Sequence, residues 1–159
     1  MAASSDADPL IWLGKCVLLH LLKKLYSEIV IPNKDAQIIK KALEEGGIRV
    51  CKTHKQFIDK VGRVETRLGI ELGEGEREAI ALAMEKRISI FLTNDENAYH
   101  VGKILSREPK GVLYVLLRSV RDGHLPKKKT KESLRQILEE GFWLSPTIIH
   151  NFHEALDNL

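Results

Sequence analysis

The sequence has very little cysteine, and this scarcity argues against two classes of protein. Cys16 and Cys51 are the only cysteines among 159 residues, and neither has a second cysteine at the C-x-x-C spacing. A small domain held together by disulfides and a zinc ribbon both need more sulfur atoms than this. We therefore expect two reduced thiols, a reducing compartment and no zinc site.

Long apolar runs are also missing. The longest, residues 10–22, is interrupted by Lys15 and His20 and is too short to cross a bilayer. Residues 1–8 are small and polar, without the basic segment and apolar core of a signal peptide. These features predict a cytoplasmic protein without a membrane partner.

The motifs of several enzyme classes are absent as well. No glycine-rich phosphate loop and no G-x-S-x-G nucleophile elbow occurs, so we predict no residues for an organic cofactor. His100, His150 and His153 do not have the spacing of a zinc site. The net charge of +3 is only a weak indication of a polyanionic partner.

The chain does contain short apolar runs that alternate with amphipathic segments, and no linker separates them. Asp8 fits an N-cap and Pro9 a first helical position, whereas residues 112–120 suit a strand or a helix equally. Such alternation predicts one α/β domain over residues 1–159, with a central parallel sheet of four or five strands. We expect helices over 9–25, 35–45, 57–68, 76–87, 95–105, 130–140 and 146–156, and strands over 28–31, 48–51 and 88–93, the last near the middle of the sheet.

Three groups of acidic residues lie where ligands bind in such a sheet. Asp6 and Asp8 precede the first helix, Asp95 follows strand 88–93, and Glu76 and Glu78 begin the helix that leads into that strand. Ligands of open parallel sheets bind at the carboxyl ends of the strands, so these acids could converge. Converging carboxylates repel one another unless a hard cation such as Mg²⁺ or Mn²⁺ lies between them. Each of these acids could equally be a helix cap or a first-turn residue that complements the helix dipole.

Several segments resemble the motifs of a PIN-like family of prokaryotic proteins related to VapC-type toxins. Residues 5–11 (SDADPLI) are similar to its SDTSPLI opening, and residues 75–83 (GEREAIALA) to its GEAEAIALA motif. Residues 91–95 (FLTND) resemble LLIDD, and residues 111–119 (GVLYVLLRS) resemble GTLGVLLRA. Residues 123–125 and 141–145 match the tail of the pattern, so the resemblance covers nearly the whole chain.

This resemblance implies a three-layer sandwich and a ribonuclease that hydrolyses RNA phosphodiesters with metal-activated water. Asp6, Glu76 and Asp95 are then the catalytic acids around Mg²⁺ or Mn²⁺, and Asp8 and Glu78 are further candidate ligands. The resemblance also implies a toxin-like nuclease, a homodimer that pairs through the apolar residues of helix 146–156, and an antitoxin-like partner.

The chain departs from the family pattern near the expected site. Residues 1–5 are not β-branched, so the first strand is weak, and Ile38 stands where the family has a helix acid. Asp8 replaces a Ser or Thr, and Asn94 replaces the first Asp of LLIDD. These departures favour an alternative in which a PIN-like module without an active metal site binds nucleic acid or protein. The basic run 127–131 could bind phosphates or lie in a solvated loop.

Overall fold

Five short parallel strands form the centre of the protein, in the order β3-β2-β1-β4-β5. A computed structural model describes all of residues 1–159. The strands are β1 (Ala3–Ser5), β2 (Ile29–Pro32), β3 (Ile48–Cys51), β4 (Ile90–Leu92) and β5 (Glu108–Lys110). In β4, Ile90 and Leu92 pack into one apolar cluster and Phe91 into another. Because both faces of the sheet are covered, β2 and β4 appear in the sequence as continuous apolar runs.

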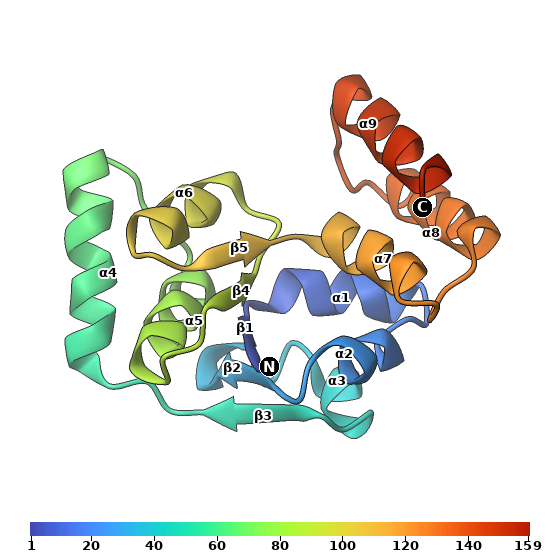
Figure 1. Ribbon diagram of the computed structural model, residues 1–159. Coiled ribbons are helices and arrows are strands. Elements are labelled where there is room, and N and C mark those ends of the chain that lie inside the picture. Colours follow the sequence, from blue (N-terminus) through green and yellow to red (C-terminus); the bar gives the residue numbers. More distant parts are fainter.

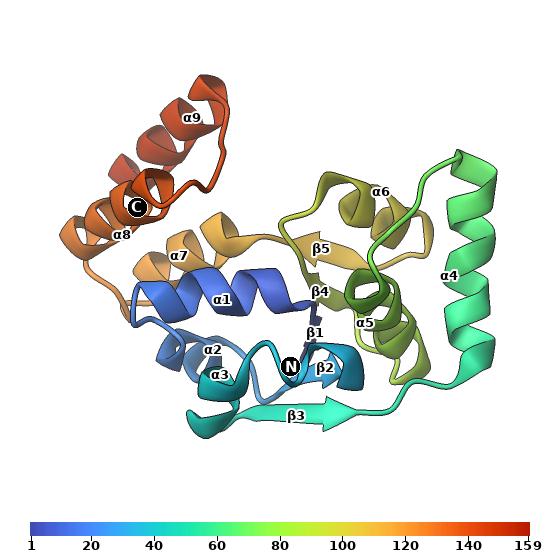
Figure 2. The same ribbon diagram turned by 180° about the vertical axis from the view of Figure 1, so that it is seen from behind.

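Helices cover the sheet on both sides, which makes three layers (Figure 1). One layer contains α4 (Lys55–Leu68), α5 (Glu74–Glu85) and α6 (Glu96–Ile104). The other layer contains α1 (Ala7–Lys15), α2 (His20–Leu25), α3 (Lys40–Glu44) and α7 (Val112–Arg121), and the 3₁₀ turn η1 (Asn33–Asp35) follows β2 and contacts α5. Beyond α7 lie α8 (Lys127–Glu139) and α9 (Pro146–Asp157), as the reverse view also shows (Figure 2). The α/β sandwich with a parallel sheet is therefore confirmed.

The prediction of one helix over residues 9–25 is wrong. The chain leaves the helix after Lys15 and passes through Val17, which has a positive φ of 57°. Leu18 then donates its backbone N–H to the Leu13 carbonyl, closing the helix end at 2.8 Å. The helical spacing continued in the sequence because α1 and α2 bury leucines in the same core. The helix begins two residues earlier than expected, with Asp6 and not Asp8 as its N-cap.

The predicted helix over 35–45 is also only partly present. After β2 the chain forms η1 and an irregular turn, and regular helix covers only Lys40–Glu44. The break leaves Asp35 buried and Ile38 exposed, which reverses the pattern expected from their polarity.

Two strands were not visible in the sequence. β1 is the middle strand of the sheet, although Ala3, Ser4 and Ser5 have no strand-forming character. Its residues are small because α5 packs directly on it, and Ser4 Oγ donates to the carbonyl of Ala79 at 2.6 Å. β5 contains Pro109 and lies at an edge, where proline is tolerated.

Four further findings bear on the sequence predictions. Residues 112–120 are helical, and the basic run 127–131 begins α8, so it is not a loop. Both cysteines are free and buried. None of the helices is both long enough and apolar enough to span a membrane.

Candidate functional site

Asp6 lies at the carboxyl end of the central strand and is only 3% exposed. Its Oδ1 accepts the backbone N–H of Asp8 at 3.3 Å, which caps α1. Its Oδ2 accepts a hydrogen bond from the Thr93 hydroxyl at 2.7 Å. Burial raises the pKa of Asp6 well above its ordinary value, and the negative charges of Glu76 and Asp8 add to the increase.

Asp95 follows β4, the strand next to β1, and is the N-cap of α6. Its Oδ1 accepts the N–H of Ala98 at 2.7 Å. Thr93 connects this turn to Asp6, because its hydroxyl donates to Asp6 and accepts the N–H of Asp95 at 3.1 Å. Two of the predicted acids are thus joined through one threonine that sequence reasoning did not single out.

Asn94 makes two bonds that the family's aspartate could not both make. Its Nδ2 donates to Asp8 Oδ2 at 2.8 Å, and its Oδ1 accepts the N–H of Val112, at the start of α7, at 2.9 Å. A carboxylate in this place would lack a hydrogen to donate to Asp8. The amide therefore holds Asp8 at the same edge of the sheet as Asp6.

Glu76 lies in the first turn of α5 and faces the other acids. Its Oε2 accepts the N–H of Gly73 at 3.1 Å. Burial raises the pKa of Glu76, and the next largest cause is the negative charge of Asp95, followed after the opposing Gly73 bond by that of Asp8. The structure therefore brings Glu76 into electrostatic contact with both aspartate turns.

An ion pair holds the turn that leads into α5. Glu65, buried on α4, accepts the N–H of Leu72 and a bond from Arg77 Nη2, both at 2.8 Å. Arg77 Nη2 also donates to the Leu72 carbonyl at 3.0 Å. Because this turn leads directly into α5, which begins at Glu74, the pair helps to fix the position of Glu76 in the first helical turn.

Asp35 is an acid of this cluster that the sequence analysis missed. It is 5% exposed, and its buried Oδ2 has no hydrogen-bond partner. Burial raises its pKa to about 6, with smaller contributions from the charges of Glu78 and Glu76. Glu78 also has a buried oxygen, Oε2, without a partner. The sequence did contain one indication of this role. Asp35 lies only three residues before Ile38, the position where the family pattern has its helix acid.

A family model described as a PIN domain matches residues 3–158. The chain belongs to the PIN domain family. A comparison with curated proteins gives no match. In this PIN domain the acids that the family motifs suggest lie beyond the carboxyl ends of adjacent strands β1 and β4, together with the first turn of α5.

The carboxylates of this PIN domain suit a hard cation in their chemistry. None of the six acids forms an ion pair with a Lys, Arg or His side chain; these acids are Asp6, Asp8, Asp35, Glu76, Glu78 and Asp95. Their oxygens are the donors that Mg²⁺ and Mn²⁺ select. No group of three or more His, Cys, Asp or Glu side chains is arranged to hold an ion, so the acids share an edge without forming a closed shell.

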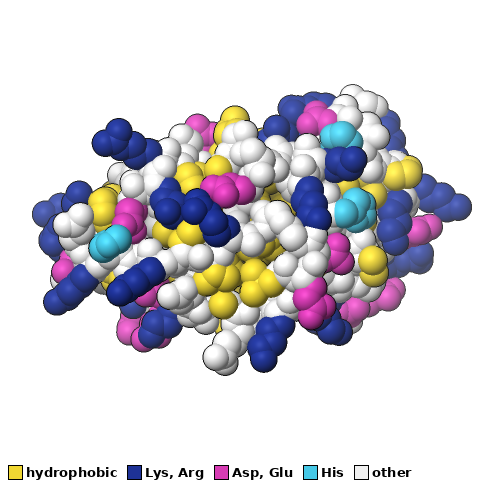
Figure 3. Space-filling model, turned by 90° about the horizontal axis from the view of Figure 1, so that it is seen from below, with side chains coloured by type: hydrophobic (Ala, Val, Ile, Leu, Met, Phe, Trp, Pro, Cys, Tyr) yellow, Lys and Arg dark blue, Asp and Glu magenta, His cyan; other side chains and the backbone are white.

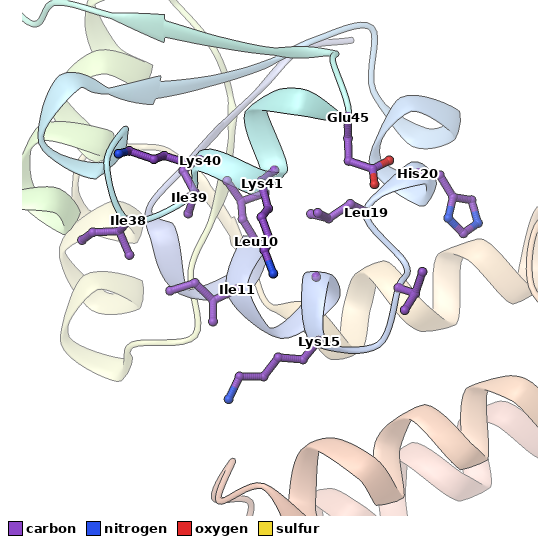
Figure 4. Close-up of a pocket in the computed structure, with 13 residues that line it drawn as sticks. Leu10, Ile11, Lys15, Leu19, His20, Ile38, Ile39, Lys40, Lys41 and Glu45 are labelled. Carbon is purple, nitrogen blue, oxygen red and sulfur yellow. The ribbon is translucent and has the colours of Figure 1, made fainter.

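A hollow of about 550 Å³ lies between α1 and α3 of the PIN domain (Figure 4). Ile38 is 63% exposed and lines this hollow with Leu10 and Ile11, which follow Asp8 on α1. Lys40 and Lys41 line it from α3. The position where the family has an acid therefore belongs to a partly apolar hollow with a basic rim.

Basic side chains also occur outside this hollow, on one face of the molecule and on α8. The face seen from below shows Lys and Arg side chains separated by apolar and acidic ones, without a single continuous patch (Figure 3). In the basic run of α8, Lys131 pairs with Asp157 at 3.2 Å and Lys127 donates to the carbonyl of the same residue. That run is partly occupied in holding α8 against α9.

Proposed function

We propose that this PIN domain is a ribonuclease that hydrolyses RNA phosphodiesters with Mg²⁺ or Mn²⁺. The observation that carries the proposal is the group formed by Asp6, Glu76 and Asp95 at one edge of the sheet, without a basic side chain paired to any of them. Carboxylates that cluster without a counter-charge raise one another's pKa, and a divalent cation removes that cost.

Asp6, Glu76 and Asp95 would hold the cation, with Asp8 and Glu78 as further ligands. When bound, the cation lowers the pKa of a water molecule and neutralises the charge that develops on the phosphodiester. Thr93 orients Asp6, and Asn94 orients Asp8, so neither aspartate has to be ordered when the substrate binds. Such fixed first ligands are the kind of preorganisation that catalytic sites need.

The basic rim of the α1–α3 hollow supports a polyanionic substrate. Lys40 and Lys41 are exposed and lie next to α1, the helix that carries Asp8. Lysines in such a place contact phosphates and position a nucleic acid without reading its sequence. We expect the RNA backbone to approach the acids from this side.

The decisive experiment is a cleavage assay on single-stranded RNA with Mn²⁺, Mg²⁺ or EDTA. Asp95→Asn removes a carboxylate but keeps a good N-cap for α6, so the fold should persist while cleavage is lost. Glu74→Gln is the matched control, because Glu74 starts the same helix as Glu76 but pairs outward with Lys34 at 3.1 Å. Cleavage that survives both EDTA and Asp95→Asn would come from a contaminating nuclease.

A second function is favoured by the absence of a closed coordination shell among the acids. Ile38, which stands where the family has an acid, points the same way. In that case the PIN domain binds nucleic acid or protein without cutting. RNA binding that is unchanged by EDTA, together with no cleavage by the wild type, would identify this function.

We also propose that the protein acts in the cytoplasm as a toxin-like nuclease, and that it is a homodimer with a small antitoxin-like protein as its partner. The helix expected to form the dimer is less available than its sequence suggested, because Phe152 and Leu156 are buried within the chain. Ile148 is exposed and Ile149 partly so. Sedimentation at tens of micromolar, a range typical of weak interfaces, distinguishes a dimer from an 18.0 kDa monomer.

A further inference from the structure

The 3₁₀ turn η1 carries a buried carboxyl group that the fold itself does not use. Asp35 is 5% exposed, and its Oδ2 has no hydrogen-bond partner. A buried polar atom without a partner costs free energy, and in a native structure it calls for an explanation such as an ion or a catalytic role. Its neighbour Lys34 does not neutralise it, because Lys34 pairs with the exposed Glu74.

Asp35 lies directly against the first turn of α5. A Cβ atom on Gly75 would be 2.3 Å from Asp35 Oδ1, so only glycine leaves room for the carboxyl group. The same turn carries Glu76, and Glu78 follows with its own buried, unpartnered oxygen. Both glutamates, as well as Asp6, interact electrostatically with Asp35. The unpartnered carboxyl group is therefore part of the acidic cluster.

The sheet topology explains this convergence. β2, β1 and β4 are consecutive in the sheet and parallel, so their carboxyl ends lie side by side. Asp6 follows β1, Asp95 follows β4, and Asp35 follows β2 within the η1 turn. Each of three adjacent strands thus delivers one aspartate to the same edge.

We propose that Asp35 is a ligand of the divalent cation at this site, in place of the acid that the family pattern has at residue 38. The inference rests on the proposed function, because it adds a ligand to the same cation. Ile38 cannot provide one, since it has no donor atom and lines the α1–α3 hollow. Glu78 lies beside Asp35 and completes the η1 side of the site.

Direct titration of Mn²⁺ by isothermal calorimetry tests the proposal without depending on RNA cleavage. Asp35→Asn keeps the size of the side chain and removes the charge. Asp59→Asn, an exposed acid on α4, is the matched control for a lost negative charge. We expect Asp35→Asn to weaken Mn²⁺ binding by about tenfold or more, since loss of even an indirect metal contact has an effect of this size. A cooperative melt of the variant in EDTA shows that it is folded.

Each outcome has a separate meaning. If the wild type binds Mn²⁺ and Asp35→Asn binds it equally well, the role of Asp35 is refuted while the proposed function stands. If the wild type binds no Mn²⁺ at millimolar concentration, the proposed function fails and the role of Asp35 fails with it. If Asp59→Asn weakens Mn²⁺ binding as much as Asp35→Asn does, the loss is a long-range charge effect, and the assignment of Asp35 is overturned.

Discussion

Replacing Asp35 with asparagine should stabilise the metal-free protein at neutral pH, although the residue is buried. The pKa of Asp35 rises from 3.8 to about 6, because burial disfavours its charged form. Each unit of pKa difference between the folded and unfolded chain corresponds to 1.36 kcal/mol, so ionised Asp35 destabilises the fold by about 3 kcal/mol. The asparagine of the variant carries no charge at any pH, so its contribution to stability does not titrate.

The sign of the pH dependence follows from which state binds the proton. Between pH 4 and 6 the folded chain keeps the Asp35 proton and the unfolded chain has lost it, so stability falls as pH rises through this window. Above pH 6 the penalty is fully present, and below about pH 4 it is absent. The free energy of unfolding of the wild type should therefore fall relative to Asp35→Asn by about 3 kcal/mol from pH 4 to pH 8.

Urea unfolding of both proteins in EDTA, at one-unit pH steps, measures this difference. For a chain of this length about 3 kcal/mol corresponds to a change of roughly 6–12 °C in melting temperature. Asp6 also titrates with a raised pKa, but it is present in both proteins and its contribution largely cancels. A difference between the two proteins that stays flat, or that grows in favour of the wild type as pH rises, would refute the reasoning.

Three further substitutions test other contacts of the site. Gly75→Ala should destabilise the protein by about 1–3 kcal/mol, because the new methyl group overlaps the Asp35 carboxyl group; urea unfolding measures this, and the second change Asp35→Ala should relieve it. Arg77→Ala should cost about 3–5 kcal/mol in thermal or urea unfolding, because it leaves the buried Glu65 charge unpaired, and an equal cost for the exposed Arg63→Ala would contradict this. Asn94→Asp should lower the free energy of unfolding in EDTA by about 1 kcal/mol, which a lower melting temperature shows. The same substitution should enlarge the stabilisation by Mn²⁺.

The sequence was informative where local pattern and tertiary structure agree. β3 runs from Ile48 to Cys51, as its β-branched run predicts, and α4 to α6 lie within two residues of their expected ends. The strand β1 gave no such signal, because its residues were selected for small size beneath α5. Close packing between a strand and a helix distant in the sequence produces no hydrophobic periodicity. The central strand was therefore the part of the sheet that was hardest to predict from the sequence.

The same limit explains why Asp35 was not found. The family pattern places its acid at residue 38 on the assumption that a regular helix follows β2. In this chain the 3₁₀ turn η1 follows β2 instead. In a 3₁₀ turn side chains repeat every three residues, so the register of a regular helix does not carry over to Ile38. The contact that buries Asp35 is with Gly75, far along the chain, and no local rule connects these positions.

The structure shows that two of the acids are helix caps, and this role is compatible with the proposed ligand role. Asp6 caps α1 and Asp95 caps α6, each with its Oδ1 atom on a backbone N–H. The two roles do not compete, because a carboxylate has two oxygens and several lone pairs. Capping fixes the plane of each carboxylate and places it at the positive end of a helix dipole, which stabilises its charge. Asp35 is not a helix cap, and its Oδ2 accepts no hydrogen bond, so its negative charge depends most on a bound cation. Substitution of Asp35 should therefore weaken metal binding while the protein stays folded.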